Sequence, residues 1–240
     1  MEATVEPCIQ TYRSKSRTNA ELEVRLGTYS DGVFSAGVSK DVFEQIERDM
    51  TDSTSLTPEA QWSEIVDYYY CHDARTIRSR VEYDTVEMKM TTTHIEKETI
   101  HSMIISRDDD PHEACRLTMC MEHPITDPPP CSIITYVRVK QRRRFTDVRD
   151  GNVVWNFELS KTWSANTREG VEVQQHMSEP SYEIECELQD SHGTYMAARS
   201  DREVAESLML KIKLLLGEEV SGKVSVLDTK QHTRRRRGRR

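Results

Sequence analysis

The sequence lacks the motifs that mark several common classes of phosphate-handling enzyme. None of its 240 residues forms a Gly-x-x-x-x-Gly-Lys-[Ser/Thr] loop, which is the phosphate-binding loop of many nucleotidases. No His-Cys pair is followed five residues later by arginine, so a phosphatase with a cysteine nucleophile is not expected. The eight histidines show no metal-ligand spacing, and the six cysteines contain no Cys-x-x-Cys pair.

Long apolar segments are also missing. No run of eighteen apolar residues occurs, so we expect no membrane-spanning helix. The first ten residues lack a basic region followed by an apolar core, so we expect no secretory signal. We therefore expect an intracellular protein whose cysteines are reduced and mostly buried.

Charge is unevenly distributed along the chain. The net charge is −8, but the last seven residues hold six arginines and no acid. Without them, 27 basic residues face 41 acidic ones, which leaves −14. An acidic body argues against a broad surface that coats nucleic acid, so any RNA contact should be local. The tail, Arg234 to Arg240, is interpreted as a disordered segment with a nuclear-import role, the alternatives being an RNA-binding tail or a plain basic end.

Three carboxylates alternate with apolar residues in the stretch Glu183-Ile184-Glu185-Cys186-Glu187. In a strand, alternate side chains share one face, so these acids lie about 7 Å apart. At an effective dielectric of 20, each neighbouring pair repels by about 2 kcal/mol. A chain that tolerates this repulsion is expected to have a cation at the acidic face.

Two further stretches have the same alternation. Glu21 and Glu23 form a second acidic pair, and a basic face carries Arg138, Lys140, Arg142 and Arg144. An ordinary solvent-exposed strand mixes the two signs, because opposite charges on neighbouring strands stabilise a sheet and like charges destabilise it. Segregated acids and bases predict a metal site facing a polyanion site. The simplest ligand that needs both is a metal-bound triphosphate.

Strand patterns dominate the middle of the chain, with one helix after a Ser39 N-cap and another between a Ser200 capping box and Gly217. We expect loops at 51–60, 107–111 and 127–130. The predicted strands are Glu21–Tyr29, Ile65–Cys71, Thr76–Tyr83, His94–Ser106, Arg116–Glu122, Ile133–Thr146, Val153–Thr162, Gly170–His176 and Tyr182–Gln189.

This pattern predicts a mainly β (α+β) protein, built as a closed antiparallel eight-stranded β-barrel with helices packed outside. A barrel of about eight strands can enclose one small ligand. Charged alternates would line the inside, and apolar alternates such as Leu22, Val139 and Ile184 would face outward under the helices. We expect a flexible N-terminal arm over 1–18, the barrel domain over 19–220 and a basic tail over 221–240.

The charged stretches resemble the motifs of the triphosphate tunnel metalloenzymes, in particular the RNA 5′-triphosphatases of fungal, protozoan and viral mRNA capping. The resemblance runs from about Glu21 to Gln189, with the three strongest motifs in the family's order. Those motifs are Glu21-x-Glu23-x-Arg25-Leu26-Gly27, Arg138-x-Lys140-x-Arg142 and Glu183-x-Glu185-x-Glu187. Weaker matches are Ile77-Arg78, Glu96-Lys97, Met121-Glu122 and Asn156-Phe157-Glu158-Leu159-Ser160-Lys161.

The resemblance implies a role for each of these residues. Glu21, Glu23 and Glu187 would hold Mg²⁺ or Mn²⁺, which favour oxygen ligands. Glu122 and Glu185, with Glu158, would orient or activate water for attack on the γ-phosphorus. The phosphate oxygens would be bound by Arg78, Lys97, Arg138, Lys140 and Arg142. Further candidates are Arg25, Arg116, Arg144, Ser160 and Glu183. Arg80 shares a face with Arg78, so the alignment with the family's arginine strand is open between these two residues.

The implied reaction removes the γ-phosphate from 5′-triphosphate RNA and leaves a 5′-diphosphate end, which a guanylyltransferase partner would cap in the nucleus. One alternative is a tunnel hydrolase of inorganic triphosphate, thiamine triphosphate or nucleoside triphosphates. A second alternative, of another class, is a non-catalytic module that binds 5′-triphosphate ends. The number of acids on the charged strands argues against the second alternative.

Overall fold

The computed structural model describes residues 2–15, 19–72, 75–84, 88–107, 113–128, 132–149, 152–190, 193–217 and 224–228. None of the described helices has the length and apolarity needed to cross a membrane. The chain forms two compact units, which are described separately below. Unit 1 comprises Met1–Gly37, Thr99–Cys120 and Cys186–Arg240, and unit 2 comprises Val38–Glu98 and Met121–Glu185.

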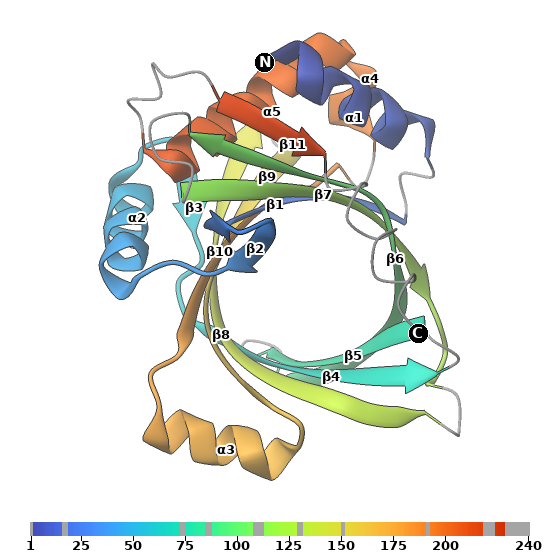
Figure 1. Cartoon of the computed structure of the whole chain (residues 1–240), viewed down its shortest axis with the longest axis vertical. Coiled ribbons are helices and arrows are strands. Elements are labelled where there is room, and N and C mark those ends of the chain that lie inside the picture. Colours follow the sequence, from blue (N-terminus) through green and yellow to red (C-terminus); the bar gives the residue numbers. More distant parts are fainter. Residues whose placement is uncertain are drawn as a thin grey trace. The chain divides into compact units, whose positions relative to one another are not determined.

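Eight strands follow one another in the hydrogen-bonded order β10-β9-β8-β4-β5-β6-β7-β1, and β1 also pairs with β10 (Figure 1). The order therefore returns to its first strand, and the predicted closed eight-stranded β-barrel is confirmed. These strands are β1 (Ala20–Ser30), β4 (Ser63–His72), β5 (Arg75–Asp84), β6 (Lys89–Arg107), β7 (Glu113–Pro124), β8 (Ile133–Arg149), β9 (Asn152–Ala165) and β10 (Ser181–Leu188).

Three short strands in the described part of the chain extend this sheet. β2 (Val33–Ala36) pairs with β1, β3 (Leu56–Pro58) with β8, and β11 (Val224–Asp228) with β6. The prediction of a loop over 51–60 is therefore wrong where β3 forms. Leu56 drives this pairing, because its side chain is buried and places the segment against Asp147 at the end of β8.

Helix α3 (Arg168–Met177) covers an apolar face of unit 2, beside β8 and β9 (Figure 1). Val171 is fully buried against Val137 and Val139. The predicted strand at Gly170–His176 is wrong. The Thr167 hydroxyl accepts a hydrogen bond from the Gly170 amide at 3.1 Å and caps a helix at this point, which outweighs the apolar alternation.

Helix α2 (Lys40–Asp52) also belongs to unit 2 and begins where the sequence predicts. The Ser39 hydroxyl accepts a hydrogen bond from the Val42 amide. Phe43 is fully buried, and its ring centroid lies 5.1 Å from that of Tyr182 at the start of β10. Contacts along its length therefore hold the helix: Phe43 also lies 6.4 Å from the Trp62 ring, Met50 is buried and Glu47 pairs with Arg143.

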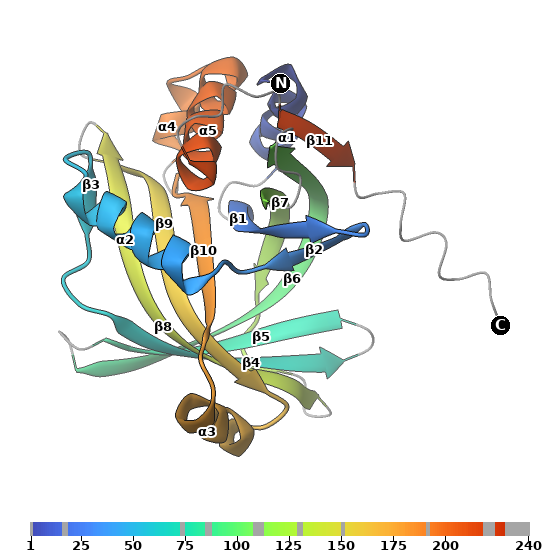
Figure 2. The same cartoon turned by 60° about the vertical axis from the view of Figure 1, so that its left-hand side comes forward.

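Unit 1 holds helices α1 (Glu2–Ser14), α4 (Thr194–Ala197) and α5 (Asp201–Leu216), with α1 and α5 side by side in Figures 1 and 2. The predicted capping box is present, with Ser200 and Glu203 bonded reciprocally, and Gly217 follows the last turn with a φ of +87°. Eight residues of α5 are buried, which confirms its predicted apolar face.

The interpretation of residues 1–18 as a loose arm is wrong where α1 forms. Val5, Ile9 and Tyr12 are buried, so the helix has an apolar stripe that its low overall hydrophobicity conceals. Arg13 fixes its end, donating to the Asp201 carboxylate at 2.5 Å and to the Arg199 carbonyl at 2.8 Å.

Some predictions fall outside the described residues. These are the arginine tail, most of the turn at 107–111, and residues 129–130 of the proline loop. Five cysteines are described and all are free thiols, four of them buried. The domain boundaries at 18/19 and 220/221 stay predictions.

Candidate functional site

The basic residues of β8 lie buried on the face of the unit 2 sheet that is turned away from α3. Arg138, Lys140 and Arg142 are 8%, 2% and 3% exposed. Their neighbours Val137 and Val139 pack toward α3, so the alternation of the strand sends the bases to the opposite side. Buried cations are costly unless they are paired with anions. We call this side of unit 2 the charged face.

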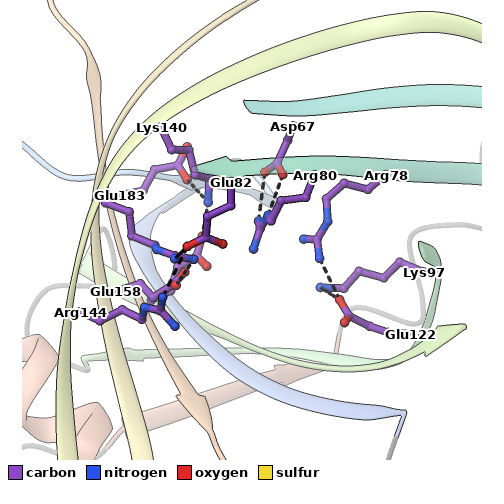
Figure 3. Close-up of polar contacts among 12 residues, drawn as sticks. Asp67, Arg78, Arg80, Glu82, Lys97, Glu122, Lys140, Arg144, Glu158 and Glu183 are labelled. Carbon is purple, nitrogen blue, oxygen red and sulfur yellow. Dashed lines mark hydrogen bonds and ion pairs between the residues drawn. The ribbon is translucent and has the colours of Figure 1, made fainter. Parts of the chain in front are cut away.

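Two carboxylates from β10 pair with two of these bases, and Figure 3 shows one of them, Glu183, together with Lys140. Glu183 accepts a hydrogen bond from Arg138 at 2.5 Å and lies 3.9 Å from the Lys140 ammonium. Glu185 lies 3.6 Å from the same ammonium. The acids and bases that the sequence places on separate strands therefore meet at Glu183, Glu185, Arg138 and Lys140.

The strand between them explains how they meet. β9 pairs with β8 so that Ser160 lies opposite Arg142 and Thr162 opposite Lys140. Both are small and buried, so the long side chains of β8 and β10 reach each other over β9. Ser160 therefore leaves room for its neighbours, whatever further role its hydroxyl has.

Further along the basic row of β8, two carboxylates hold Arg142. Glu158 on β9 lies 3.0 Å from one terminal nitrogen of its guanidinium, and Glu82 on β5 pairs with the other. Arg144 lies 2.8 Å from Glu59 and 3.5 Å from Glu82. The candidates Glu158, Arg142 and Arg144 are thus brought together, through a carboxylate that the sequence reasoning missed.

A second group forms on β5, β6 and β7. Glu122 lies 3.3 Å from the Arg78 guanidinium and 3.8 Å from the Lys97 ammonium (Figure 3). All three are partly exposed, at 18% to 28% of the side chain. Three weak sequence matches on separate strands therefore prove to be neighbours on the charged face.

Asp67 on β4 and Arg80 on β5 are further members that no motif singled out as a pair. Arg80 donates two hydrogen bonds to the fully buried Asp67 carboxylate, at 2.8 and 3.0 Å. Burial acts to raise the pKa of Asp67, but Arg80 outweighs it, and the pKa lies below the ordinary value. A signal was present: Arg78, Arg80 and Glu82 alternate on β5, and Asp67 is the one acid of the apolar and aromatic stretch Ile65–Cys71.

Several buried donors on the charged face have no acceptor among the described residues. These are the Nε–H groups of Arg78, Arg138 and Arg142, and the Ser160 hydroxyl also lacks a partner there. An unsatisfied buried polar group is costly and is expected to have a ligand or water as its partner. Guanidinium N–H groups in a fixed plane suit the oxygens of a phosphate. The charged face is therefore built to accept an anion.

The remaining candidates belong to unit 1. Glu23 on β1 is buried and accepts a hydrogen bond from Arg25 at 2.9 Å. Arg116 on β7 lies over the Phe34 ring, 4.9 Å from its centroid. Both arginines have thus a contact within unit 1.

Glu21, Glu23 and Glu187 are the residues predicted to hold a cation. They lie on β1 and β10, which pair, and all offer carboxylate oxygens, so the donor chemistry fits Mg²⁺ or Mn²⁺. Within the described residues, no three acidic, histidine or cysteine side chains are already grouped around one point as a metal site.

Comparison with known proteins gives matches among solved structures. The RNA triphosphatase Pct1 of S. pombe is 13% identical, with a TM-score of 0.63, over 89% of this chain and 91% of that one. The Mimivirus capping enzyme triphosphatase is 13% identical, with a TM-score of 0.57, over 90% and 96%. No family model and no curated protein sequence matches the chain.

This chain has the fold of the RNA triphosphatases. The predicted resemblance to the triphosphate tunnel family is thereby confirmed at the level of the fold. The two sequences are only 13% identical. Alternation and strand register decide which side chains share a face of the paired strands, so a chain can bring its charged residues together without close sequence similarity.

Proposed function

We propose that this protein removes the γ-phosphate from the 5′-triphosphate end of RNA, which leaves a 5′-diphosphate end for capping. The observation that supports this most is the set of buried guanidinium and ammonium groups on the charged face, with donors that lack an acceptor among the described residues. Among polyanions, we propose the 5′-triphosphate end of RNA as the substrate because the chain shares its fold with RNA triphosphatases.

The basic side chains bind and orient the phosphates. Arg138 has one terminal nitrogen held by Glu183, and Arg142 has both held, by Glu158 and Glu82, so the plane of each guanidinium is fixed. The remaining N–H groups then point at positions that phosphate oxygens can occupy without reorganisation. Lys140, between Glu183 and Glu185, adds a compact charge to the middle of the row.

Carboxylates on the same face would orient the attacking water and accept its proton. Glu185 beside Lys140, Glu158 beside Arg142 and Glu122 beside Arg78 each lie next to a proposed phosphate-binding cation. Water bonded to such a carboxylate lies within reach of a phosphorus atom that the cation positions. The row of cations stabilises the charge that develops on the phosphate oxygens during attack.

A divalent cation would be held by Glu21, Glu23 and Glu187. When bound, Mg²⁺ or Mn²⁺ supplies Lewis-acid polarisation of a phosphate oxygen. Glu23 would exchange its contact with Arg25 for the cation.

Phosphate release from RNA labelled on its γ-phosphate tests the proposal, measured with Mg²⁺ and with Mn²⁺. Arg142→Ala is compared with Arg143→Ala, the next residue on the same strand, whose guanidinium points to the other face and pairs with Glu47. We expect Arg142→Ala to lower kcat/KM by about a hundredfold or more, as for loss of one electrostatic contact in a transition state. Arg143→Ala should retain most of the activity. No release by the wild-type protein from RNA would contradict the proposal.

Competition separates RNA from smaller substrates. Inorganic triphosphate and free ATP are added to the same assay, and Glu187→Ala is run beside the wild type. Release that requires metal, disappears in Glu187→Ala and prefers RNA supports capping. Release from the small molecules alone would indicate a general triphosphatase and not an RNA triphosphatase.

The cellular setting follows from the same proposal. We propose that the protein acts in the nucleus, guided by its arginine tail, and supplies diphosphate ends to a guanylyltransferase. One structure in the comparison is of Pct1 in complex with the Spt5 CTD. If a protein lacking residues 221–240 still enters the nucleus, the tail is not the import signal.

A further inference from the structure

Two tyrosines extend the basic row of β8 at one end of the charged face. Tyr69 on β4 lies directly opposite Tyr136 on β8, with ring centroids 5.3 Å apart and an interplanar angle of 50°. Tyr69 follows Asp67 by two residues, and Tyr136 precedes Arg138 by two, so both rings lie on the charged face. Both are half-buried, unlike the buried bases beside them.

A local irregularity in the pairing of β4 with β8 lies at this pair. The register between β4 and β8 shifts between Tyr69 and Tyr70, so that Thr135 is an extra residue on β8. The Thr135 hydroxyl donates to the Tyr69 carbonyl at 3.2 Å and fixes the shift. Bulges often occur at barrel rims and next to active sites, where they redirect a side chain. The alternation therefore ends at the aromatic pair.

The alternative role for the two tyrosines is purely structural, since cross-strand aromatic pairs also stabilise sheets. A purely structural pair is expected among apolar residues. Tyr68, the neighbour of Tyr69, fits that description, because it packs against the apolar cluster of Val137, Val139 and Val171. Tyr69 and Tyr136 instead lie next to Arg138, whose Glu183 partner is part of the proposed phosphate site. Aromatic rings continuous with a basic row are typical of surfaces that bind single-stranded nucleic acid.

The spacing along β8 gives the bound RNA a direction. Tyr136, Arg138, Lys140 and Arg142 follow one another on one face at steps of about 7 Å. Phosphates held along Arg138 to Arg142 place the attached nucleoside at the next position beyond either end. At the far end, Glu59 and Glu82 surround Arg144, and these carboxylates repel the later phosphates of an RNA chain. The Tyr136 end presents two rings instead.

We propose that Tyr69 and Tyr136 form a stacking site for the base of the first nucleotide of the 5′-triphosphate RNA. This inference rests on the proposed function, and it adds the orientation of the substrate: the γ-phosphate lies toward Lys140 and Arg142, and the nucleoside lies at the tyrosines. Stacking does not read base edges, so the site accepts any base and favours purines for their larger ring surface.

The test compares a substrate that has a base with one that has none. Kinetic constants are measured for 5′-triphosphate RNA and for inorganic triphosphate with the wild type, Tyr69→Ala, Tyr136→Ala and both Tyr→Phe variants. Tyr83→Ala is the matched control, because Tyr83 is an exposed tyrosine of unit 2 on the opposite face of β5 from Glu82. We expect each alanine variant to raise KM for RNA by about tenfold, with KM for inorganic triphosphate unchanged, since one stacked base contributes about that much. The phenylalanine variants and Tyr83→Ala should resemble the wild type.

Binding measurements keep this test independent of turnover. A fluorescent 5′-triphosphate RNA is titrated with each protein, and inorganic triphosphate displaces it. The wild type should bind the RNA more tightly than inorganic triphosphate, and the alanine variants should lose that difference. Equal losses for both ligands would show that the rings merely support Arg138 and would overturn the stacking site, as would unchanged binding of both. Wild-type protein that binds RNA but releases no phosphate would overturn the proposed reaction and leave the stacking site standing.

Discussion

At the scale of single residues, the charged face is a network in which most charges have two neighbours. Lys140 lies between Glu183 and Glu185, and Arg142 lies between Glu82 and Glu158. Asp67 has the most buried carboxylate of this network, at 0% exposure. Removing one member of a buried pair is more costly than removing both, because the remaining charge stays buried without a partner.

Asp67→Asn should lower the free energy of unfolding at pH 7 by about 3 kcal/mol, because Arg80 loses its buried partner. The pKa of Asp67 in the folded protein lies below its value of about 3.9 in an unfolded chain. Its stabilising contribution is therefore complete above about pH 5 and is lost as the pH falls toward the lower folded-state pKa. Urea unfolding from pH 7 to pH 3 should show the wild type and Asp67→Asn converging at acid pH.

The double variant Asp67→Leu, Arg80→Met is the control for this prediction. It removes both charges and should recover much of the stability that Asp67→Asn loses. A constant difference between wild type and Asp67→Asn across the whole pH range would contradict the assigned role of the ionised carboxylate.

Ser160→Ala should separate stability from activity. The Ser160 hydroxyl is fully buried and has no hydrogen-bond partner among the described residues. Its removal should leave the melting temperature unchanged or raise it, since an unsatisfied buried hydroxyl costs about 1 to 3 kcal/mol. If the hydroxyl binds phosphate as predicted, KM for RNA should rise about tenfold in the same variant. A drop in melting temperature with unchanged kinetics would show that the hydroxyl has a purely structural partner.

At the scale of elements, strands take their places by register, and their ends depend on local contacts. β2 returns along β1 with Gly27 opposite Ala36. A Cβ atom on Gly27 would lie 2.2 Å from the Ser35 carbonyl oxygen and 2.7 Å from the Phe34 ring. This close approach explains why glycine ends the motif that begins at Glu21, on the strand that carries two of the proposed metal ligands.

Gly27→Ala should therefore destabilise the protein by about 1 to 3 kcal/mol, because the backbone of β2 must move to admit a methyl group. Thermal melting measures the change. Thr28→Ala, at the next and exposed position of β1, is the control and should melt within about 1 °C of the wild type. Equal melting temperatures for Gly27→Ala and Thr28→Ala would show that β2 is free to shift.

At the scale of the whole molecule, the composition is rich in charge, with 36% hydrophobic and 31% charged residues. The charged face of unit 2 explains part of this, because its strands carry ion pairs on one side and apolar residues on the side that α3 covers. The segregation of like charges means that part of the stability should come from bound ions.

Mn²⁺ should raise the melting temperature by about 5 °C at a concentration a hundred times its dissociation constant, because it binds the folded state. The same experiment with Glu187→Ala should show a much smaller shift, and Glu98→Ala, at a largely exposed carboxylate of β6, should keep the full shift. An identical midpoint with and without Mn²⁺ for the wild type would contradict the predicted metal site.

The sequence by itself determined the eight strands of the barrel, their two faces and the fold class. Alternation is a local property, so the side chains that share a face can be predicted from one strand alone, as in Glu183 to Glu187 and Arg138 to Arg144. Caps such as Ser39 and Ser200 are equally local, and both helices begin there. Thr167 is also a local cap, and overlooking it led to the wrong strand at 170–176.

Tertiary structure alone decided which charges meet. The pairing of Asp67 with Arg80, the place of Glu82 beside Arg142, and the facing rings of Tyr69 and Tyr136 depend on the register of strands that are distant in sequence. The same holds for α1, whose buried stripe has meaning only against α5. Register is a property of pairs of strands, and a one-residue slip reverses every face, so no single strand contains this information.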